Sequence, residues 1–520
     1  MVAMVKKQFP VNTKSSKQEP QRKGAFWETL RNLFGIDSRS LAVFRMAMGA
    51  LLLLDLGTRV ADLNTMYTDD GMFSRAEICR RATSIWNWSF HFGSGSWEYQ
   101  AMLFGIAAAL AVALTAGFET RLATIGSWLM LVSIHHRVPP ILSGAEILLR
   151  MLLFWAMFLP LDRTWSLRAW LEKRRGGVAM HRNQAQVLSV ASAAILLQMG
   201  LMYLFSAIFK SNGVWLRGEA LVGVLKHDFF ASPISAYLLQ FPRLLTGMTW
   251  GTFALEWAAA LLLFWPRGTA RLRLVLITAL VAMHAGIGIC LEVGLFSPVA
   301  LAGLILFLPA QFWNSRLLTR ISRESQRVSP LPGTGNYVAK ESPGRLVQAV
   351  CMLLLVYVMA VNINSLRSHP LAALAPERWT PLARGCALRQ SWGMFESVPS
   401  KSGWYVARAK LKDGSEVDLL REGAALDWRK PKFPARMYPN RYWQKLFREM
   451  AYDDEQGFQV LRAPVAEFLC RNWNARTNAE KQIRQFEFVY LTEGNAGPTK
   501  ASSSPQISRE QLVHLDLGDP

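Results

Sequence analysis

The chain has 520 residues, of which 51% are hydrophobic and 11% aromatic, and its mean hydropathy is +0.15. This content excludes an ordinary soluble enzyme, since the apolar residues come in long blocks rather than in alternation. The formal net charge of +21 would in a soluble chain suggest nucleic acid as a partner. No helix-turn-helix, zinc or base-stacking motif accompanies the charge, so we expect the lipid bilayer as a partner and no nucleic acid.

The N-terminal arm, residues 1–40, is polar and rich in Lys and Arg. It contains no apolar core followed by a small-residue cleavage site, so it does not resemble a cleavable signal peptide. We therefore expect a basic cytoplasmic arm that precedes the first membrane helix.

Apolar blocks of membrane-spanning character follow between residues 41 and 365. The blocks are 41–56, 101–118, 122–134, 147–161, 187–209, 244–265, 272–291, 299–312 and 346–361. Their number predicts an all-α polytopic membrane bundle of about nine transmembrane helices. The third, fourth and eighth blocks are short, so one of them could be re-entrant.

Basic residues concentrate in four segments, which are the N-terminal arm, Leu161–Arg182, Pro266–Arg273 and Arg316–Arg345. Nine spans that start in the cytoplasm put all four segments on the cytoplasmic side, as the positive-inside rule requires. Eight spans would break this agreement. The pattern therefore predicts a multi-pass cell-membrane protein with a cytoplasmic N-terminus and an extracytoplasmic C-terminal domain.

The composition changes after Ser365 to that of a soluble module. Residues Trp404–Lys412 alternate as in a strand, Asp413-Gly414 suits a two-residue turn, and Ser415–Leu420 returns as a second strand. We also expect helices at 442–452 and 463–473 and a strand at 483–491. The residues from 366 to 493 thus form a small α+β domain.

The last segment, residues 494–520, is rich in Ser, Pro and Gly and is expected to be disordered. The five cysteines show no CxxC motif and no metal-ligand spacing, so no metal site is predicted. Cys386 and Cys470 both fall in the C-terminal domain and could form a disulfide if it faces an oxidising compartment.

The most informative segment is Tyr203–Trp215, YLFSAIFKSNGVW, where a long apolar run stops at Lys210. A lysine held against hydrocarbon has its charged form disfavoured and can become a usable base near neutral pH. Alternatively, Lys210 only snorkels to the headgroups. Two observations count against snorkelling: the outer side should carry fewer basic residues, and Ser211-Asn212-Gly213 makes a turn directly afterwards.

Other ionisable residues lie within apolar blocks, where charge is costly. Glu256 is either protonated or bonded to a partner on another helix, for function or for packing. His284 is either a satisfied core histidine or part of a functional pocket. Glu146 and Arg150 are four residues apart, so they form either a helix-stabilising ion pair or part of a polar cavity.

Four segments together resemble a known family, the HTTM domain of the vitamin K-dependent gamma-carboxylases and their bacterial relatives. The segments are Phe158–Leu167 (FLPLDRTWSL), Tyr203–Trp215, His284–Pro309 (HAGIGICLEVGLFSPVALAGLILFLP) and Ser391–Phe395 (SWGMF). They occur in the same order as in the family and span most of the chain from residue 41 to 493.

The resemblance implies that Lys210 matches the family's catalytic lysine and that His284 lines the same pocket. The remaining candidate pocket residues, in supporting roles, are Tyr203, Trp215, Glu256, Arg150 and Glu146. In the family, a reduced naphthoquinone is deprotonated by the lysine, oxygen converts the anion to a strong base, and a peptidyl glutamate is deprotonated and carboxylated. The resemblance thus implies a quinone-type cofactor and a peptide or protein substrate at the outer face.

This chain departs from the family pattern at several positions. The carboxylases have an active histidine where this chain has Ala145-Glu146, and an acidic residue where it has Arg168. The C-terminal module is also shorter than one that captures a protein substrate. Fold and function are separate inferences. A non-catalytic membrane scaffold whose outer domain binds a protein is therefore the alternative to a quinone-dependent enzyme.

Overall fold

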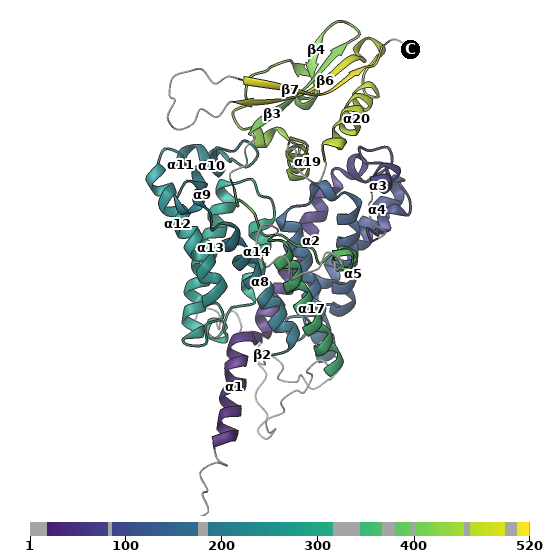
Figure 1. Ribbon diagram of the computed structural model, residues 1–520. Helices are drawn as coiled ribbons and strands as arrows, with labels where there is room; N and C mark the ends of the chain where they lie inside the picture. The colour runs from purple at the N-terminus through teal and green to yellow at the C-terminus, as the bar shows by residue number, and fades with distance from the viewer. Residues whose placement is uncertain are drawn as a thin grey trace, which may run out of the picture.

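The computed structural model is a helical bundle capped at one end by a β-sheet domain, with the first helix projecting from the other end (Figure 1). The structure describes residues 18–81, 86–174, 186–315, 344–366, 380–397, 402–451, 458–493 and 507–518. The start of the basic arm, most of the basic segment 316–345 and the start of the predicted tail lie outside the described residues.

Every apolar block expected to span the membrane overlaps a helix, although the blocks 147–161 and 299–312 extend beyond the helix that they overlap. These helices are α2 (Ser38–Val60), α4 (Trp97–Ala116), α5 (Thr120–Arg137), α6 (Gly144–Ala156), α8 (Val190–Phe209), α12 (Pro242–Leu262), α13 (Thr269–Cys290), α14 (Phe296–Ile305) and α17 (Arg345–Asn364). Within the described residues, five of them, α2, α4, α8, α13 and α17, are long and apolar enough to cross a membrane. The prediction of a helical membrane domain is therefore confirmed, whereas nine spans are not established.

The shorter helices and short strands connect and flank the bundle. They are α1 (Gln18–Phe34), α3 (Arg75–Arg81), α7 (Leu167–Arg174), α9 (Gly213–Leu216), α10 (Ala220–Lys226), α11 (Pro233–Leu238), α15 (Ala310–Trp313) and α18 (Thr380–Gly385), with β1 (Ile36–Asp37) paired antiparallel to β2 (Gln186–Val187). Helix α8 is central, because it packs against α6, α12 and α17. Helix α2 packs against α4 and against α14, so an early and a late helix of the bundle lie side by side.

The C-terminal domain is an antiparallel sheet of order β5-β4-β3-β6-β7 with two helices. Its elements are β3 (Gly403–Leu411), β4 (Glu416–Asp418), β5 (Ala424–Ala425), α19 (Arg441–Ala451), α20 (Arg462–Asn474), β6 (Ile483–Glu493) and β7 (Ile507–Asp516). The predicted hairpin turn is present but is one residue longer than expected, because Leu411 pairs with Ser415 and leaves three residues, 412–414, in the turn. Gly414 has φ +87°, a conformation that glycine adopts without strain. The α+β fold was thus predictable from local patterns.

Part of the predicted disordered tail is ordered. Residues 507–516 form β7, which pairs with β6 along its length, from Ile507 opposite Glu493 to Asp516 opposite Gln485. Leu512, Val513 and Leu515 pack against the core, and that burial explains why the segment folds. The Ser/Pro/Gly-rich composition is confined to the connection before this strand.

The possible disulfide between Cys386 and Cys470 is not formed, because both residues are free cysteines. Cys470 is buried on α20 in the C-terminal domain. Cys386 follows α18 and interacts with Tyr357 of the bundle helix α17. The two thiols therefore belong to different parts of the molecule.

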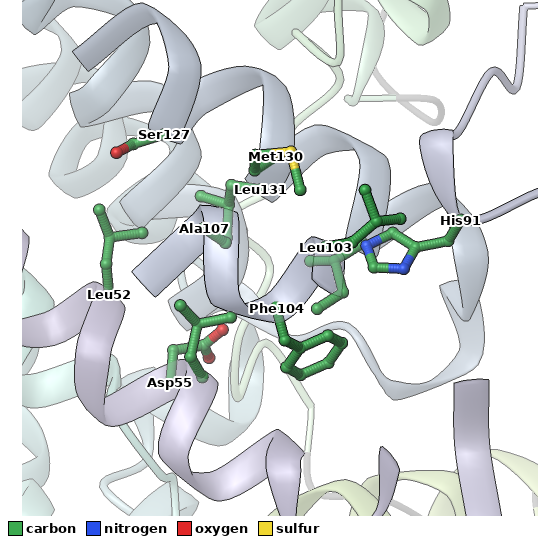
Figure 2. Close-up of a pocket in the computed structure, with 11 residues that line it drawn as sticks. Leu52, Asp55, His91, Leu103, Phe104, Ala107, Ser127, Met130 and Leu131 are labelled. Atoms are coloured by element: carbon green, nitrogen blue, oxygen red, sulfur yellow. The ribbon is translucent and has the colours of Figure 1, made fainter. Parts of the chain in front are cut away.

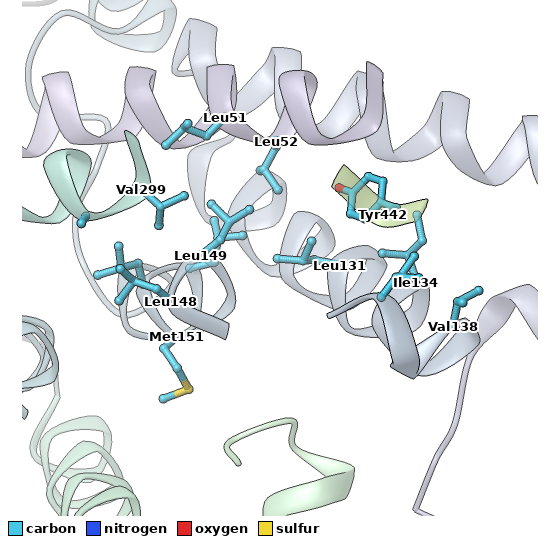
Figure 3. Packing of buried hydrophobic residues seen from close by; sticks show 14 of the residues in the cluster. Leu51, Leu52, Leu131, Ile134, Val138, Leu148, Leu149, Met151, Val299 and Tyr442 are labelled. Atoms are coloured by element: carbon cyan, nitrogen blue, oxygen red, sulfur yellow. The ribbon is translucent and has the colours of Figure 1, made fainter. Parts of the chain in front are cut away.

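The apolar core runs without interruption from the bundle into the C-terminal domain. Tyr442, from the first turn of α19, belongs to the same buried cluster as Ile134, near the end of α5, and Val138, directly after α5 (Figure 3). Tyr442 is 1% exposed, so the domain is seated on the bundle through buried contacts.

Candidate functional site

The local sequence places Lys210 at the end of α8. The helix starts with a capping box in which Ser189 and Ser192 satisfy each other's backbone, and an apolar run then carries it to Phe209. Lys210 is the C-cap residue, and Asn212 caps the following short helix through its side chain. A cation at a helix C-terminus is favoured by the helix dipole.

Lys210 is buried and does not reach the surface. Its Nζ donates to Glu256 Oε1 at 2.5 Å and to Ser206 Oγ at 2.7 Å, and only 5% of the residue is exposed. Ser206 also donates to the same carboxylate oxygen at 3.2 Å. We call Lys210, Ser206 and Glu256 the bundle site. The expectation that Glu256 has a partner on another helix is confirmed.

Trp215 closes the bundle site together with the segment that contains the SWGMF motif. The Lys210 Nζ lies 5.1 Å from the centroid of the Trp215 ring, within the range of a cation–π contact. The Trp215 indole donates to the Phe395 carbonyl at 2.8 Å, and Asn212 donates to the Glu396 carbonyl at 2.8 Å. Two segments that are remote in sequence therefore meet beside the lysine.

Tyr203, three residues before Ser206 on α8, forms a second buried pair with His284 of α13. The Tyr203 hydroxyl and His284 Nε2 are 2.9 Å apart, and the ring of Phe296 lies 5.8 Å from that of His284. His284 Nδ1 has no hydrogen-bond partner within the described part of the chain. Both residues also interact electrostatically with the bundle site, Tyr203 with Glu256 and His284 with Lys210.

Of the two alternatives for Glu146 and Arg150, the i,i+4 ion pair is not formed. Glu146 turns back to cap its own helix, accepting from the Ser143 backbone at 2.7 Å, and lies 3.5 Å from Arg441. Arg150 donates to the Arg389 carbonyl at 3.0 Å instead. The i,i+4 prediction is wrong because the capping position and the C-terminal domain offer each side chain a different partner.

Glu146 belongs to a second buried group, which joins the bundle to α19. Asp55 accepts from Arg59 at 2.7 Å through one oxygen and from Arg441 and Tyr442, each at 2.5 Å, through the other. We call Asp55, Arg59, Glu146, Arg441 and Tyr442 the junction cluster. Burial lowers the pKa of Arg441, but the charges of Glu146, Tyr442 and Asp55 outweigh burial and raise it above its usual value.

A small apolar cavity borders the junction cluster on the bundle side. Its volume is about 20 Å³, and Asp55, His91 and Ser127 are its polar lining residues (Figure 2). This volume suffices for about one water molecule and not for a substrate. Burial lowers the pKa of His91, which bonds Gln100, to about 4, so His91 is neutral at physiological pH.

Sequence reasoning missed Ser206 and most of the junction cluster. Ser206 carried a signal, since it lies four residues before Lys210 and therefore on the same helix face. Asp55 and Arg59 carried the same i,i+4 signal in the first span. Arg441 and Tyr442 carried none, because their role depends on how the C-terminal domain is seated.

Among the residues that the structure describes, no group of three or more His, Cys, Asp or Glu side chains could hold a metal ion. Comparison with curated proteins and with solved structures finds no match. The profile of the HTTM domain matches residues 35–313, which is more than half of the chain and includes every residue of the bundle site. The chain therefore belongs to the HTTM domain family.

Proposed function

We propose that this protein is a quinone-dependent membrane enzyme in which Lys210 is the base. One observation carries the proposal, namely that Lys210 is buried against the carboxylate of Glu256 rather than exposed to headgroups. A buried lysine paired with a carboxylate is costly to retain for structure alone, because apolar side chains of similar size often serve a fold equally well. Intramembrane ion pairs of this kind are typical of functional sites.

The bundle site can supply a neutral amine. Transfer of one proton from Lys210 to Glu256, across a 2.5 Å hydrogen bond, leaves an uncharged amine and an uncharged carboxylic acid. The amine then accepts a proton from a bound hydroxyl, and Glu256 retains the proton that it received.

The residues present fit an aromatic ligand with hydroxyl groups. Glu256 Oε2 and His284 Nδ1 are both buried and have no hydrogen-bond partner within the described residues, so each retains unused hydrogen-bonding capacity. Trp215 supplies aromatic surface beside Lys210, and Phe296 supplies it beside His284. A reduced naphthoquinone bound there would supply an acidic hydroxyl and, with oxygen, a strong base for a peptide or protein substrate at the outer face.

The alternative, a non-catalytic scaffold, predicted that Lys210 points into the headgroups. The burial of Lys210 does not support that prediction. The departures at Ala145-Glu146 and Arg168 leave the identity of the substrate open to experiment. Glutamate carboxylation is the first activity to assay, since it is the one that the resemblance implies.

The test compares Lys210→Arg with the unchanged chain in lipid nanodiscs, following oxygen consumption with a reduced naphthoquinone. Arginine keeps the charge and reach but cannot supply a neutral amine, so we expect turnover to fall by about a hundredfold or more. Lys226→Arg, at an exposed position, is the matched control and should retain full turnover. Full turnover in Lys210→Arg would show that the amine is not the base.

We also propose that the C-terminal domain is extracytoplasmic, on the support of the basic-segment pattern. A topology reporter should be fused after Pro520 rather than after Glu493, because the strand β7 lies between them and completes the sheet. Reporter activity only in the cytoplasm would contradict this orientation and the placement of the bundle site near the outer face.

A further inference from the structure

The segment of residues 227–230, between α10 and α11, lies at the end of the bundle that faces the C-terminal domain (Figure 1). His227, Asp228 and Phe229 are each at most 5% exposed. Connecting segments normally lie at the surface, so the burial of a carboxylate and an aromatic ring in this connection requires specific partners. We call residues 227–230 the latch segment, because the C-terminal domain holds it through three successive residues.

Asp228 is held by an ammonium and a hydroxyl group of the C-terminal domain. Lys430 Nζ lies 2.9 Å from Asp228 Oδ1 and 2.8 Å from Glu493 Oε2, so one ammonium serves two carboxylates. The Ser402 hydroxyl donates to Asp228 Oδ2 at 2.8 Å. Removal of the Lys430 ammonium would leave two carboxylates that repel each other across this contact.

Phe229 and Phe230 are held by the side chains that follow in the C-terminal domain. The ring of Phe229 stacks on that of Tyr438 with 6.0 Å between the centroids, and the Phe229 carbonyl accepts from the side chain of Gln444. The Arg448 guanidinium lies 4.8 Å from the centroid of the Phe230 ring, within the range of a cation–π contact. The position of the latch segment therefore depends on how the C-terminal domain is seated.

The latch segment also contacts the residues that cover the bundle site. The ring of Phe230 packs edge-on against that of Phe395, with 5.2 Å between the centroids. The Phe395 carbonyl accepts from the Trp215 indole, whose ring lies beside Lys210 Nζ. A continuous series of contacts thus runs from the C-terminal domain through Phe230 and Phe395 to the lysine.

Phe395 is held in a strained backbone conformation at the middle of this series. Its φ is +58°, in the left-handed region that a bulky side chain disfavours. Such a conformation persists only where the surrounding contacts enforce it, and it recurs at clamps and switch regions. Withdrawal of the Phe230 ring would remove one of these contacts and let the backbone that carries the Trp215 acceptor relax.

We propose that α9 and residues 391–397 form a lid over the bundle site, and that the C-terminal domain keeps this lid closed through the latch segment. Lys210 is 5% exposed and Trp215 is 2% exposed, so a ligand reaches the amine only after a covering segment moves. The lid and the latch segment have few residues between them, and movement of the C-terminal domain is the event that releases both. This inference rests on the proposed function for its purpose, since it concerns admission to the same site.

The test measures hydrogen–deuterium exchange of the full chain in nanodiscs, with the amides of α9 as the readout. The N–H groups of Leu216 and Arg217 are bonded to carbonyls one turn earlier, so their exchange reports the opening of α9. Lys430→Met removes the shared ammonium and should accelerate this exchange about tenfold, whereas β3 and β6 should exchange as before. Unchanged exchange in α9 would overturn the proposal.

Phe230→Leu tests the same series of contacts from within the bundle. It keeps an apolar side chain but removes the ring that contacts Phe395, and it should also accelerate exchange in α9 about tenfold. Adding Lys430→Met should bring no further acceleration, because both changes release the same segment. A product of the two effects, about a hundredfold, would show that the two residues act on α9 separately and would contradict the proposal. Should Lys430→Met loosen β3 and β6 as well, Phe230→Leu alone decides by the same criterion.

Arg471→Met is the matched control. Arg471 joins the C-terminal domain to the bundle through a different segment, donating to the carbonyls of Asp70 and Gly71 at 2.9 and 3.1 Å. This variant should leave exchange in α9 unchanged. Equal acceleration in Arg471→Met and Lys430→Met would show that any loosening of the domain reaches α9, and the latch segment would then have no special role. None of these measurements needs turnover, so the coupling can fail while Lys210→Arg still identifies the amine as the base, and the reverse.

Discussion

The bundle site and the junction cluster are both buried arrangements of opposite charges, but they differ in how the carboxylate is satisfied. In the junction cluster, both oxygens of Asp55 are bonded, one to Arg59 and the other to Arg441 and Tyr442. In the bundle site, Lys210 and Ser206 share one oxygen of Glu256, and the other oxygen has no partner among the described residues.

The two arrangements also differ in what they connect. The bundle site joins α8 to α12 within the HTTM domain, whereas the junction cluster joins α2 and α6 to α19 of the C-terminal domain. A saturated carboxylate that links two domains is suited to holding them together. A carboxylate with a free oxygen beside a buried amine is suited to receiving or giving a proton. Burial of charge by itself therefore does not distinguish a structural site from a chemical one.

The largest effect is expected from Asp55→Ala. This change removes the acceptor that Arg59 and Arg441 share and leaves two cations in a buried position. Breaking a buried ion pair on one side costs about 3–5 kcal/mol of unfolding free energy. Thermal unfolding in nanodiscs, combined with limited proteolysis, should show a large loss of stability and earlier release of the C-terminal domain.

Asp70→Ala is the control for this change, since Asp70 is exposed in the neighbouring segment. It should leave the unfolding midpoint nearly unchanged. If Asp55→Ala were as mild as Asp70→Ala, the junction cluster would not be what seats the C-terminal domain, and the contrast between the two sites would fail.

A smaller effect should follow from removing both charges of the bundle site. Glu256→Leu alone strands the Lys210 ammonium and should destabilise the protein by about 3 kcal/mol. Adding Lys210→Met removes the stranded charge, so the double variant should recover most of that stability while remaining inactive. A double-mutant cycle on thermal unfolding measures this recovery. A double variant less stable than Glu256→Leu would mean that the pair supports the fold more than the proposed chemistry requires.

The sequence predicted the elements well and the partners of side chains poorly. The hairpin at Asp413-Gly414 and the capped helix α8 follow from local chemistry, so both could be predicted from the sequence. The sequence indicated that Glu256 could have a partner on another helix and that Lys210 was important. No local pattern indicates that these two residues contact each other. An ion pair of Glu146 with Arg150 was one of two alternatives, because helix spacing was the only geometry that the sequence offered.

The strand β7 illustrates the same limit in the backbone. Its segment, ISREQLVHLD, alternates only weakly and follows a Ser/Pro/Gly-rich stretch, so composition suggested disorder. Its order depends on pairing with β6, a partner supplied by the tertiary fold. Long-range pairing and domain seating are thus the two features that local patterns did not contain.

The smallest effect concerns Lys445, which lies one turn after Arg441 on α19, outside the membrane helices. Burial, together with the charge of Arg448, lowers the pKa of Lys445 to about 8, although Glu449 beside it acts in the opposite direction. The unfolded chain holds this proton up to about pH 10, the ordinary range of lysine. Between these values the unfolded state binds more protons than the folded state, so stability rises with pH in that window.

The matched comparison is Lys445→Met, which keeps the length of the side chain and removes the charge. At pH 7 the methionine variant avoids the cost of a buried ammonium, and this advantage should shrink by about 2 kcal/mol between pH 8 and pH 10, as Lys445 of the unchanged chain loses its proton. Unfolding midpoints of both chains across this range give the difference directly, since other titrating groups cancel. A difference that stays constant from pH 7 to pH 10 would show that Glu449 keeps Lys445 charged. Lys445 would then extend the ion pairing of the junction cluster along α19.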